Sequence, residues 1–384
     1  MLILPQQLQN DIEQYAQKVQ DFTNGIISET EFKVFRVPMG VYEQRKNGTY
    51  MVRVRCVAGY ITPKLLQVVC DIAEKYGSKL LHITTRQEFQ IQNISLENSV
   101  HIISELYQYG LTTRGGGGNT VRNIMASVDS GIAKDEIFDV FPYAVNLTNF
   151  LISQPSSWAL PRKYKISFSN SSKDTGYAIF NDLGFIAKQQ DSTQGFAVYV
   201  GGSLSSQPMI GELLFNFIPS SDIYTVAEAV KQVFNKYGNR RNKHKARLRF
   251  IFYKYGTEQV LNWIRTAYNE LKTIETSYLF EPITLSKQTD FDKNIYTDNS
   301  DSNFILWKKR YVTQQKQKGY VSFEIPCKYG NFSPSTLRDL AKYFEPYGDD
   351  IIRFSMRQTI FVRNIPEIHI YEIISNREKI KITD

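Results

Sequence analysis

The sequence lacks the features that mark several large classes of protein. It has three cysteines, Cys56, Cys70 and Cys327, which are too few and too scattered for a disulfide framework and predict a reducing, cytoplasmic location. Neither these cysteines nor the four histidines have the spacing of a zinc site. No apolar run reaches the roughly 18 residues of a membrane helix, and the N-terminus lacks the basic flank of a signal peptide. We therefore expect no membrane association.

Motifs for nucleotide binding and for nucleophilic catalysis are also missing. The glycine run in "RGGGGN", residues 114–119, leads into neither the Gly-Lys-Ser/Thr of a P-loop nor a GxGxxG helix start. No local Ser/His/Asp or Cys/His motif occurs. What remains is a chain with 42% hydrophobic residues, a net charge of +8 and a pI near 9.1. Such a chain has a full core and favours an anionic partner: nucleic acid, a small oxyanion or an acidic protein.

The sequence contains one long internal repeat. "LHITTRQEFQIQNI" at 81–94 matches "IRFSMRQTIFVRNI" at 352–365, and the match keeps the same offset of 271 residues over more than forty positions. This period is far longer than the 20–50 residues of a solenoid. A duplicated supersecondary unit with pseudo-twofold symmetry is therefore predicted, with the working site where the two halves meet.

Each copy of the repeat predicts a strand, a helix, two strands and, in the first copy, a further helix. Thr62-Pro63 and Ser333-Pro334 are helix starts, because Thr or Ser caps the first turn and Pro fits its first position. Gly77 and Gly348 are the expected helix stops. Two strands meeting near Arg86 and a helix over 96–109 follow. This βαββα order is most of a ferredoxin-like split-βαβ unit.

A different region lies between the copies. Residues 160–275 predict strands at "KYKISFSN", "GYAIF", "GFIAK" and "GFAVYVGG", and helices near 222–237 and 257–271, so this region is a mixed α/β domain. The fold class is therefore α+β: duplicated ferredoxin-like half-domains in a pseudo-twofold arrangement, plus a mixed α/β domain. The predicted divisions are a helical segment at 1–30, the first half-domain at 31–150, the α/β domain at 151–286, a linker at 287–310 and the second half-domain at 311–384.

Four basic residues are candidates for an anion site. Lys163 and Lys165 alternate with apolar residues, so on a strand both would point to one side, where two ammonium groups repel unless an anion lies between them. Arg86 is placed mid-strand in a sequence otherwise suited to burial, and Arg122 follows the glycine run. The alternative is that these are ordinary surface charges.

Two further stretches could bind a ligand. The glycine run would allow the backbone to approach a large flat ligand closely, or would be a mobile loop. The basic stripe at 238–249, "GNRRNKHKARLR", has six Lys/Arg and no acid. It suggests a phosphate or carboxylate site, nucleic-acid binding or a solvated helix face. It lacks the interleaved aromatic residues of single-strand binders.

Taken together, these motifs resemble a known family. "TTRQEFQIQNI", "GLTTRGGGGNTVRNI", "LPRKYKISFSN", "GFAVYVGG" and "GNRRNKHKARLRF" occur in the order and spacing of the sirohaem-dependent sulfite/nitrite reductases, over about residues 30–375. The resemblance implies that Arg86, Arg122, Lys163 and Lys165 bind the oxyanion on the open face of sirohaem. Arg357, the repeat mate of Arg86, is expected to be structural. The macrocycle and its carboxylates would be held by Arg114, Gly115, Gly116, Gly117, Gly118, Asn119, Asn123, Arg240, Arg241, Lys243, Lys245 and Arg247.

One departure from the family concerns its [4Fe–4S] cluster. The family uses four cysteines in a CxxxxxC and a CxxxC pair, and this chain has neither pair. The sequence ends where the cluster-bearing domain is expected. The resemblance therefore implies the N-terminal three-quarters of the enzyme, as a fragment, split subunit or truncated product. No metal ligand is assigned, and the isolated chain is expected to be inactive without a chain that carries the cluster.

The expected reaction is the six-electron reduction of sulfite to sulfide. The electron donor would be an acidic carrier such as ferredoxin, which suits a charge of +8. Two alternatives stay open: a ferredoxin-type nitrite reductase that makes ammonia, and a catalytically inactive sirohaem- or anion-binding fragment. A nucleic-acid binder is a more distant possibility, and no nucleic acid is expected as partner.

Overall fold

A computed structural model describes residues 2–273, 280–283, 285 and 302–375. The chain divides into two compact units. The insert unit comprises Met1–Val41, Thr113–Gly131 and Asp135–Ile283, and the repeat unit comprises Tyr42–Thr112, Ile132–Lys134 and Thr284–Asp384. This division differs from the predicted boundaries, because residues 1–41 and most of 113–150 pack with the insert unit. Among the described residues, every helix is too short or too polar to span a bilayer.

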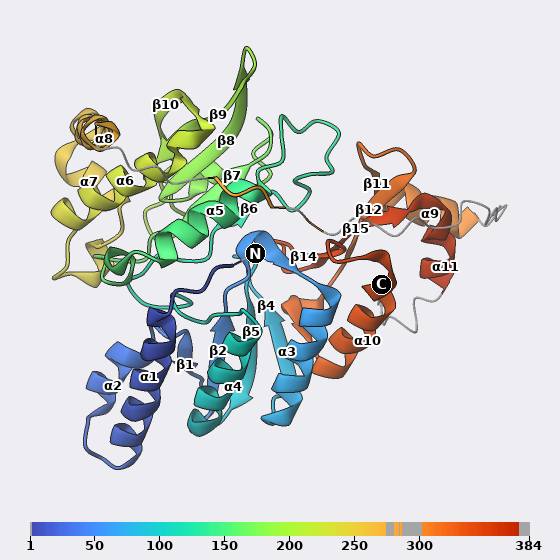
Figure 1. The fold of residues 1–384 in the computed structure, drawn as a ribbon, viewed down its shortest axis with the longest axis horizontal. Coiled ribbons are helices and arrows are strands. Elements are labelled where there is room, and N and C mark those ends of the chain that lie inside the picture. Colours follow the sequence, from blue (N-terminus) through green and yellow to red (C-terminus); the bar gives the residue numbers. More distant parts are fainter. Residues whose placement is uncertain (1, 274–279, 284, 286–301, 376–384) are drawn as a thin grey trace. The chain divides into compact units, whose positions relative to one another are not determined.

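The repeat unit contains both copies of the internal repeat (Figure 1). The first copy consists of β1 (Val41–Glu43), β2 (Tyr50–Val54), β3 (Tyr60–Ile61), α3 (Pro63–Lys75), β4 (Leu80–Ile83), β5 (Phe89–Ile94) and α4 (Leu96–Gln108). The second consists of α9 (Ser302–Tyr311), β11 (Val312–Gln314), β12 (Tyr320–Ile325), β13 (Asn331–Phe332), α10 (Pro334–Phe344), β14 (Ile352–Phe354), β15 (Ile360–Pro366) and α11 (Ile370–Ser375).

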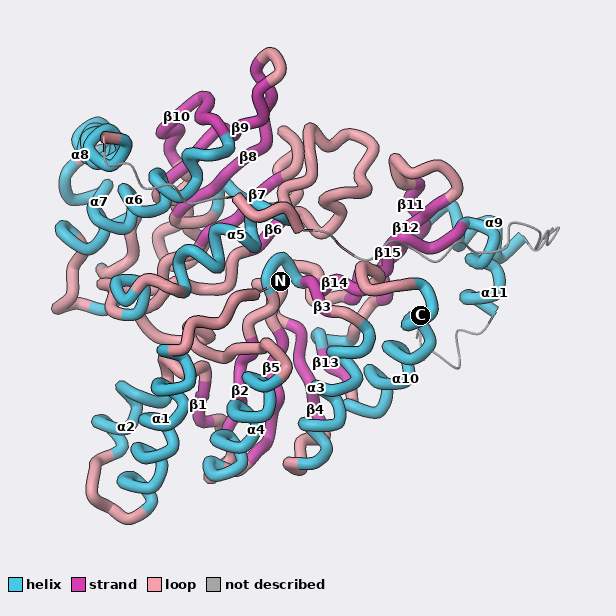
Figure 2. The backbone as a smooth tube through the Cα atoms, viewed as in Figure 1, coloured by secondary structure: helices cyan, strands magenta, loops and turns pink. Residues whose placement is uncertain are grey.

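The two copies exchange a short strand. One five-stranded sheet has the order β1-β2-β5-β4-β13, and the other has the order β11-β12-β15-β14-β3. Thus β13 of the second copy pairs with β4 of the first, and β3 of the first copy pairs with β14 of the second (Figure 2). Helices α3 and α10 pack against each other, with Arg338 contacting Asp71 at 2.7 Å. The predicted pseudo-twofold pair of ferredoxin-like units is confirmed.

The backbone repeats the same unusual conformations at the offset of 271 residues. Three non-glycine pairs share a left-handed backbone with φ between 51° and 63°: Ala58 and Tyr329, Gln87 and Gln358, and Asn93 and Asn364. L-residues rarely adopt this conformation without a local reason. Its repetition shows that the two copies have the same turns as well as the same elements.

The predicted helix starts are confirmed, and one helix end is not. Thr62 accepts a hydrogen bond from the Leu65 amide at 3.1 Å, and Ser333 accepts one from the Thr336 amide at 3.1 Å. Helix α3 ends just before Gly77, as predicted, whereas α10 ends at Phe344 and not beside Gly348. Pro346 explains the difference, because its ring lacks the amide hydrogen that would continue the helix, and a 3₁₀ turn follows instead.

The insert unit is a mixed α/β layer. Its sheet has the order β10-β9-β8-β7-β6, with β6, β7 and β8 parallel and the remaining pairs antiparallel. Phe168 stacks on Phe185 at 4.6 Å in its core. Its elements are α1 (Gln7–Thr23), α2 (Glu29–Arg36), β6 (Met125–Ala126), α5 (Phe141–Ile152), β7 (Ile166–Ser169), β8 (Leu183–Gln190), β9 (Thr193–Val200), β10 (Glu212–Pro219), α6 (Ile223–Tyr237), α7 (Arg249–Tyr255) and α8 (Thr257–Lys272).

Two local predictions were wrong. The "GYAIF" stretch is a turn and not a strand, because the Asp174 carboxylate accepts hydrogen bonds from the amides of Ala178 at 2.7 Å and Ile179 at 3.3 Å. The predicted linker at 287–310 contains all of α9 except its last residue, Tyr311, and Trp307 of this helix packs on Phe323 at 6.1 Å. The rest of that linker, 287–301, lies outside the described residues.

Candidate anion and cofactor site

The glycine run folds tightly around Arg122. Residues 115–117 are buried, the Gly115 amide donates to the Pro38 carbonyl at 2.8 Å, and the Gly116 carbonyl accepts a hydrogen bond from the Arg122 guanidinium. The Thr120 hydroxyl donates to the Gly117 carbonyl at 2.8 Å. The run is therefore an ordered support for the arginine, and not a free loop.

The neighbours of the run have different surroundings. Arg114 pairs with Asp11 at 2.8 Å and stacks over Trp158 at 4.8 Å. Asn119 is exposed and accepts a hydrogen bond from Arg162 at 3.3 Å, whereas Asn123 is fully buried. Arg114 is thus already engaged by an internal acid, while Asn119 lies at the surface.

Arg122 and the two candidate lysines lie on adjacent extended segments. The Arg122 amide donates to the Tyr164 carbonyl at 2.9 Å, and the Tyr164 amide donates to the Thr120 carbonyl at 3.0 Å. Tyr164 is fully buried, while Lys163 and Lys165 on either side of it are half-buried. The predicted alternation therefore holds, although the strand β7 itself begins only at Ile166.

The basic stripe 238–249 divides into an exposed and a buried part. Arg240, Arg241, Lys243 and Lys245 are exposed, whereas Arg247 is buried. Two nitrogens of the Arg247 guanidinium donate to Asp182, at 3.0 Å to each carboxylate oxygen from Nη2 and at 3.3 Å from Nε. Arg249, also buried, donates to the Ser203 hydroxyl at 2.8 Å.

Positive charge is concentrated around Lys163. Burial, followed by the nearby charges of Arg247, Arg122 and Arg162, lowers the pKa of Lys163 to about 8, and Asp182 opposes this shift. Burial and the charge of Arg247 also lower the pKa of Arg249. A lysine held among three arginines is an environment that a bound anion would stabilise.

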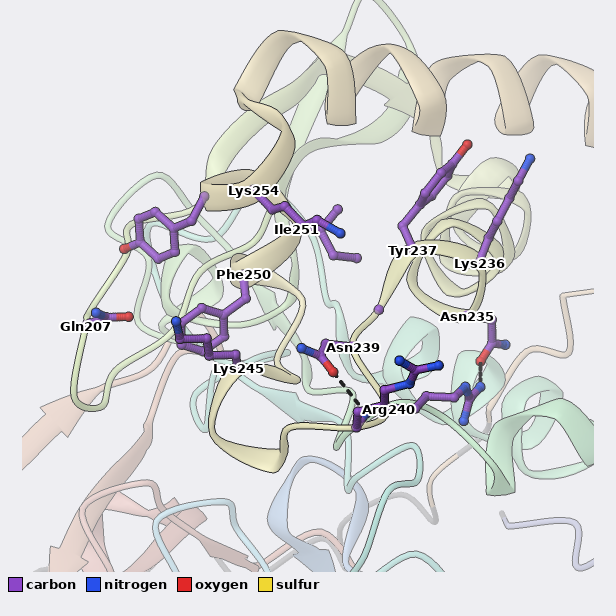
Figure 3. Close-up of a pocket in the computed structure, with 13 residues that line it drawn as sticks. Gln207, Asn235, Lys236, Tyr237, Asn239, Arg240, Lys245, Phe250, Ile251 and Lys254 are labelled. Carbon is purple, nitrogen blue, oxygen red and sulfur yellow. Dashed lines mark hydrogen bonds between the residues drawn. The ribbon is translucent and has the colours of Figure 1, made fainter.

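The exposed part of the stripe borders a pocket with a volume of about 1180 Å³ (Figure 3). Arg240 donates hydrogen bonds to Asn235 at 3.0 Å and to the Ala159 carbonyl at 3.1 Å. The described lining contains five cations and no acid. It consists of Gln207, Asn235, Lys236, Tyr237, Gly238, Asn239, Arg240, Arg241, Lys245, Phe250, Ile251, Tyr253 and Lys254. Three of the predicted cofactor-binding residues are among them, whereas Lys243 is not.

The prediction that two strands meet near Arg86 is confirmed, whereas its placement mid-strand is wrong, because Arg86 lies in a turn. The turn joins β4 to β5, and the Thr84 hydroxyl accepts hydrogen bonds from the Arg86 and Glu88 amides, each at 3.2 Å. Arg86 is 9% exposed. It belongs to the repeat unit, whereas Arg122, Lys163 and Lys165 share the insert unit. The structure therefore brings three of the four residues together within one unit and describes Arg86 within the other.

Two residues of this site were missed from the sequence. Asp182 follows no recognisable motif, and its role depends on segments 17 and 65 residues away that donate hydrogen bonds to it. Arg162 directly precedes Lys163 and could have been included as a third cation of the same segment.

The cysteines are packing residues. Cys56 and Cys70 are buried and Cys327 is partly buried. Burial raises the pKa of all three thiols, that of Cys70 to about 12 and that of Cys327 to about 12. Within the described part of the chain, no group of three or more His, Cys, Asp or Glu side chains could hold a metal ion.

Comparison with family models matches both parts of the chain. Residues 117–272 match the nitrite and sulphite reductase 4Fe-4S domain, although this segment contains no cysteine. Residues 42–109 and 313–376 match the nitrite/sulfite reductase ferredoxin-like half domain, once for each copy of the repeat. The two predicted half-domains are thereby confirmed.

Individual relatives carry two different names. A ferredoxin–nitrite reductase of Synechococcus elongatus is 26% identical over 340 residues, covering 85% of this chain and 61% of the relative. A sulfite reductase [ferredoxin] 2 of Mycolicibacterium paratuberculosis is 28% identical over 331 residues, covering 86% of this chain and 55% of the relative. The solved structure of the NirA protein of Mycobacterium tuberculosis superposes with a TM-score of 0.75 at 25% identity, covering 93% of this chain and 64% of NirA. The chain thus spans little more than half the length of the curated relatives.

Proposed function

Because the chain belongs to the sirohaem-dependent sulfite and nitrite reductase family, we propose that it binds sirohaem and a small oxyanion. The proposed reaction of the complete enzyme is the six-electron reduction of sulfite to sulfide. Nitrite reduction to ammonia is the second candidate, because relatives of both names are similar to this chain. Ferredoxin is the proposed donor, since the names of these relatives include it and an acidic carrier suits a charge of +8.

The observation that carries the proposal is the excess of positive charge around Lys163. Arg247 is neutralised by Asp182, but Arg122 and Arg162 add two further charges beside the lysine. Like charges held together in a partly buried place are costly unless an anion joins them. An oxyanion would supply that compensation.

Each basic residue then has a distinct role. Arg122 is held by the Gly116 carbonyl and offers a fixed charge to the anion. Lys163, with a pKa of about 8, is mostly protonated at neutral pH yet gives up a proton readily, which suits a donor to oxygens that leave as water. Lys165 and Arg86 are proposed as further ligands of the anion. Fixed positive charges of this kind stabilise the charge of a bound oxyanion.

The pocket beside the basic stripe fits sirohaem by its chemistry. Its described lining combines cations with the aromatic rings of Tyr237, Phe250 and Tyr253, which suits a flat macrocycle that carries many carboxylates. We propose that Arg240, Arg241 and Lys245 bind these carboxylates. When bound, sirohaem would supply the iron at which electrons reach the oxyanion.

The cysteines do not fit a [4Fe–4S] cluster. Such a cluster is held by four thiolates, whereas this chain has three cysteines, each with a raised thiol pKa. We therefore propose that the cluster that this family uses is held by cysteines outside residues 1–384. The chain alone should not reduce sulfite with reduced methyl viologen, and turnover together with four irons per chain would contradict this.

Substitution of Lys163 tests the proposed function. The chain is loaded with sirohaem, followed by its visible absorbance, and titrated calorimetrically with sulfite or nitrite. We expect Lys163→Met to weaken oxyanion binding about tenfold, as one lost charge-assisted contact is worth about 1.4 kcal/mol or more. Lys33→Met, which removes an exposed cation of α2 in the same unit, is the control and should change binding less than twofold.

The pH dependence gives a second reading. Lys163 is charged below its pKa of about 8 and neutral above it, so nitrite binding should weaken as the pH rises through 8. Lys163→Met should remove that dependence. Tight binding that is insensitive to both the substitution and the pH would reject Lys163 as a ligand of the anion.

A further inference from the structure

Asp182 is a fully buried carboxylate directly before β8. Its side chain accepts a hydrogen bond from the Lys165 amide at 2.9 Å and is paired with Arg247 at 3.0 Å. Its own carbonyl accepts a hydrogen bond from the Gly201 amide at 3.0 Å. One side chain thus joins the lysine segment to the buried end of the basic stripe.

This pairing places Arg247 among the charges that act on Lys163. The groups that face Lys163 are Arg247, Arg122 and Arg162, which disfavour its charge, and Asp182, which favours it. The charge of Asp182 also favours the charged form of Arg249 and the neutral form of Tyr164. The charge of Glu228 acts on Tyr164 in the same direction. Hydrogen bonding to a buried carboxylate keeps a guanidinium in place with little freedom to move.

We propose that Asp182 is a positioning residue for the oxyanion site: it fixes the backbone at Lys165 and holds Arg247 beside Lys163, so that it governs how readily Lys163 releases its proton. This deepens the proposed function and rests on it for its consequence, since Lys163 is there assigned to the oxyanion. The arrangement itself depends only on contacts within the insert unit.

Substitutions on the two sides of the pair have opposite expected effects. Asp182→Asn keeps an acceptor for the Lys165 amide but leaves the charge of Arg247 uncompensated, so the pKa of Lys163 should fall below 8. Arg247→Gln removes a positive charge, so the pKa of Lys163 should rise above 8. In the double variant, the pKa of Lys163 should lie between its values in the two single variants. A purely structural pair would lower the melting temperature in both single variants and leave Lys163 unaffected.

The pKa of Lys163 can be measured without any anion present. Trace acetylation of the purified chain at several pH values, read by mass spectrometry at Lys163, reports the fraction of neutral amine. We expect the titration midpoint of Lys163 to move down by at least about half a pH unit in Asp182→Asn and up by at least as much in Arg247→Gln. Each shift corresponds to about a threefold change in labelling at fixed pH. Equal titration curves in the wild type and both variants, or displacements in the same direction, would overturn the proposal.

Two further variants serve as controls for the titration of Lys163. Arg247→Lys keeps the charge and should leave the titration of Lys163 near that of the wild type, which gives a reading if Asp182→Asn does not fold. Asp350→Asn breaks another buried Asp–Arg pair, with Arg353 and Arg363, that is not among the groups acting on Lys163. It should lower the melting temperature and leave the labelling of Lys163 unchanged.

The two proposals fail in different ways. If the opposite displacements occur but neither sulfite nor nitrite binds the sirohaem-loaded chain, the oxyanion function is wrong and the positioning role stands. If an oxyanion binds through Lys163 but its titration is the same in all variants, the positioning role of Asp182 is wrong.

Discussion

Arg86 and Arg357 occupy equivalent turns in the two copies of the repeat, yet their surroundings differ. In each turn the following glutamine has a left-handed backbone, with φ of 60° at Gln87 and 63° at Gln358. Arg86 is 9% exposed, whereas the Arg357 side chain is 69% exposed and forms an ion pair with Glu324. The position equivalent to Glu324 in the first copy is Arg53.

Some features are shared by the two copies and others are not. Both copies keep the turn, its left-handed residue and the helix caps, so these features serve the fold. The charges differ: Arg357 is paired with Glu324, whereas the first copy has a cation, Arg53, at the position equivalent to Glu324.

The largest expected effect concerns Asp350, a carboxylate with no equivalent in the first copy, which has Lys79 at that position. Asp350 pairs with Arg353 at 3.0 Å and Arg363 at 3.3 Å, both buried, where the first copy has Lys79, His82 and Gln92. Asp350→Asn should destabilise the chain by about 3–5 kcal/mol, because two buried guanidiniums lose their counter-charge. Thermal unfolding measures this loss. Lys79→Met, at the exposed equivalent position, should change stability by less than about 0.5 kcal/mol.

The second-largest effect is expected at two equivalent turn glycines, Gly59 and Gly330, where alanine should cost different amounts of stability. A methyl group on Gly59 would lie 2.1 Å from the Phe354 carbonyl oxygen, and on Gly330 it would lie 2.7 Å from the Ile83 carbonyl oxygen. Both have positive φ, so both alanine variants are strained. We expect Gly59→Ala to cost about 3 kcal/mol and Gly330→Ala about 2 kcal/mol in urea unfolding. A larger cost for Gly330→Ala than for Gly59→Ala would show that the backbone around Gly59 can shift to accommodate a methyl group.

Exchanging the charges between the copies tests the proposed role of Arg86. Arg53→Glu should place a carboxylate at the position from which Glu324 pairs with Arg357, and so weaken oxyanion binding by the sirohaem-loaded chain about tenfold, or about 1.4 kcal/mol. The converse variant, Glu324→Arg, should leave binding within twofold of the wild type. Unchanged titration curves for Arg53→Glu would argue against Arg86 as a ligand.

The smallest effect is expected at Arg357 itself. Its ion pair with Glu324 is exposed on the arginine side, and exposed pairs contribute about 1 kcal/mol or less. Arg357→Gln should therefore lower the melting temperature by no more than a few degrees, and high salt should reduce the difference. A loss comparable with that of Asp350→Asn would mean that the turn needs its arginine for folding.

Much of the repeat unit could be predicted because the sequence repeat and the residues at helix starts are visible in the sequence itself. The offset of 271 residues identified the duplication, and Thr62-Pro63 and Ser333-Pro334 identified two helix starts that the structure confirms. The exchange of β3 and β13 could not be predicted, because a two-residue strand shows no alternation and its pairing is decided by a distant segment. Arg86 was placed in a strand for a different reason: apolar alternation continues on both sides of its turn, which the Thr84 hydroxyl sets.

The candidate site was predictable where basic residues follow one another in the sequence. Lys163, Lys165 and the stripe at 238–249 stand out by charge alone, but their division into exposed and buried members depends on packing. Asp182 has no motif, since its partners Lys165 and Arg247 come from separate segments. Whether the pocket beside Arg240 is large enough for a macrocycle could not be judged from composition.

The exchanged strands constrain how this chain can fold as it is synthesised. Ile61 pairs with Ile352, and His82 with Asn331, so neither sheet is complete until the segments at 331–332 and 352–354 have left the ribosome. The first copy must therefore wait with an unpaired sheet edge, at β4, while the insert is made, and such edges invite wrong pairing between nascent chains. Slow, late closure dominated by long-range contacts follows from this topology. Neither copy of the repeat should form a finished sheet when it is produced without the other.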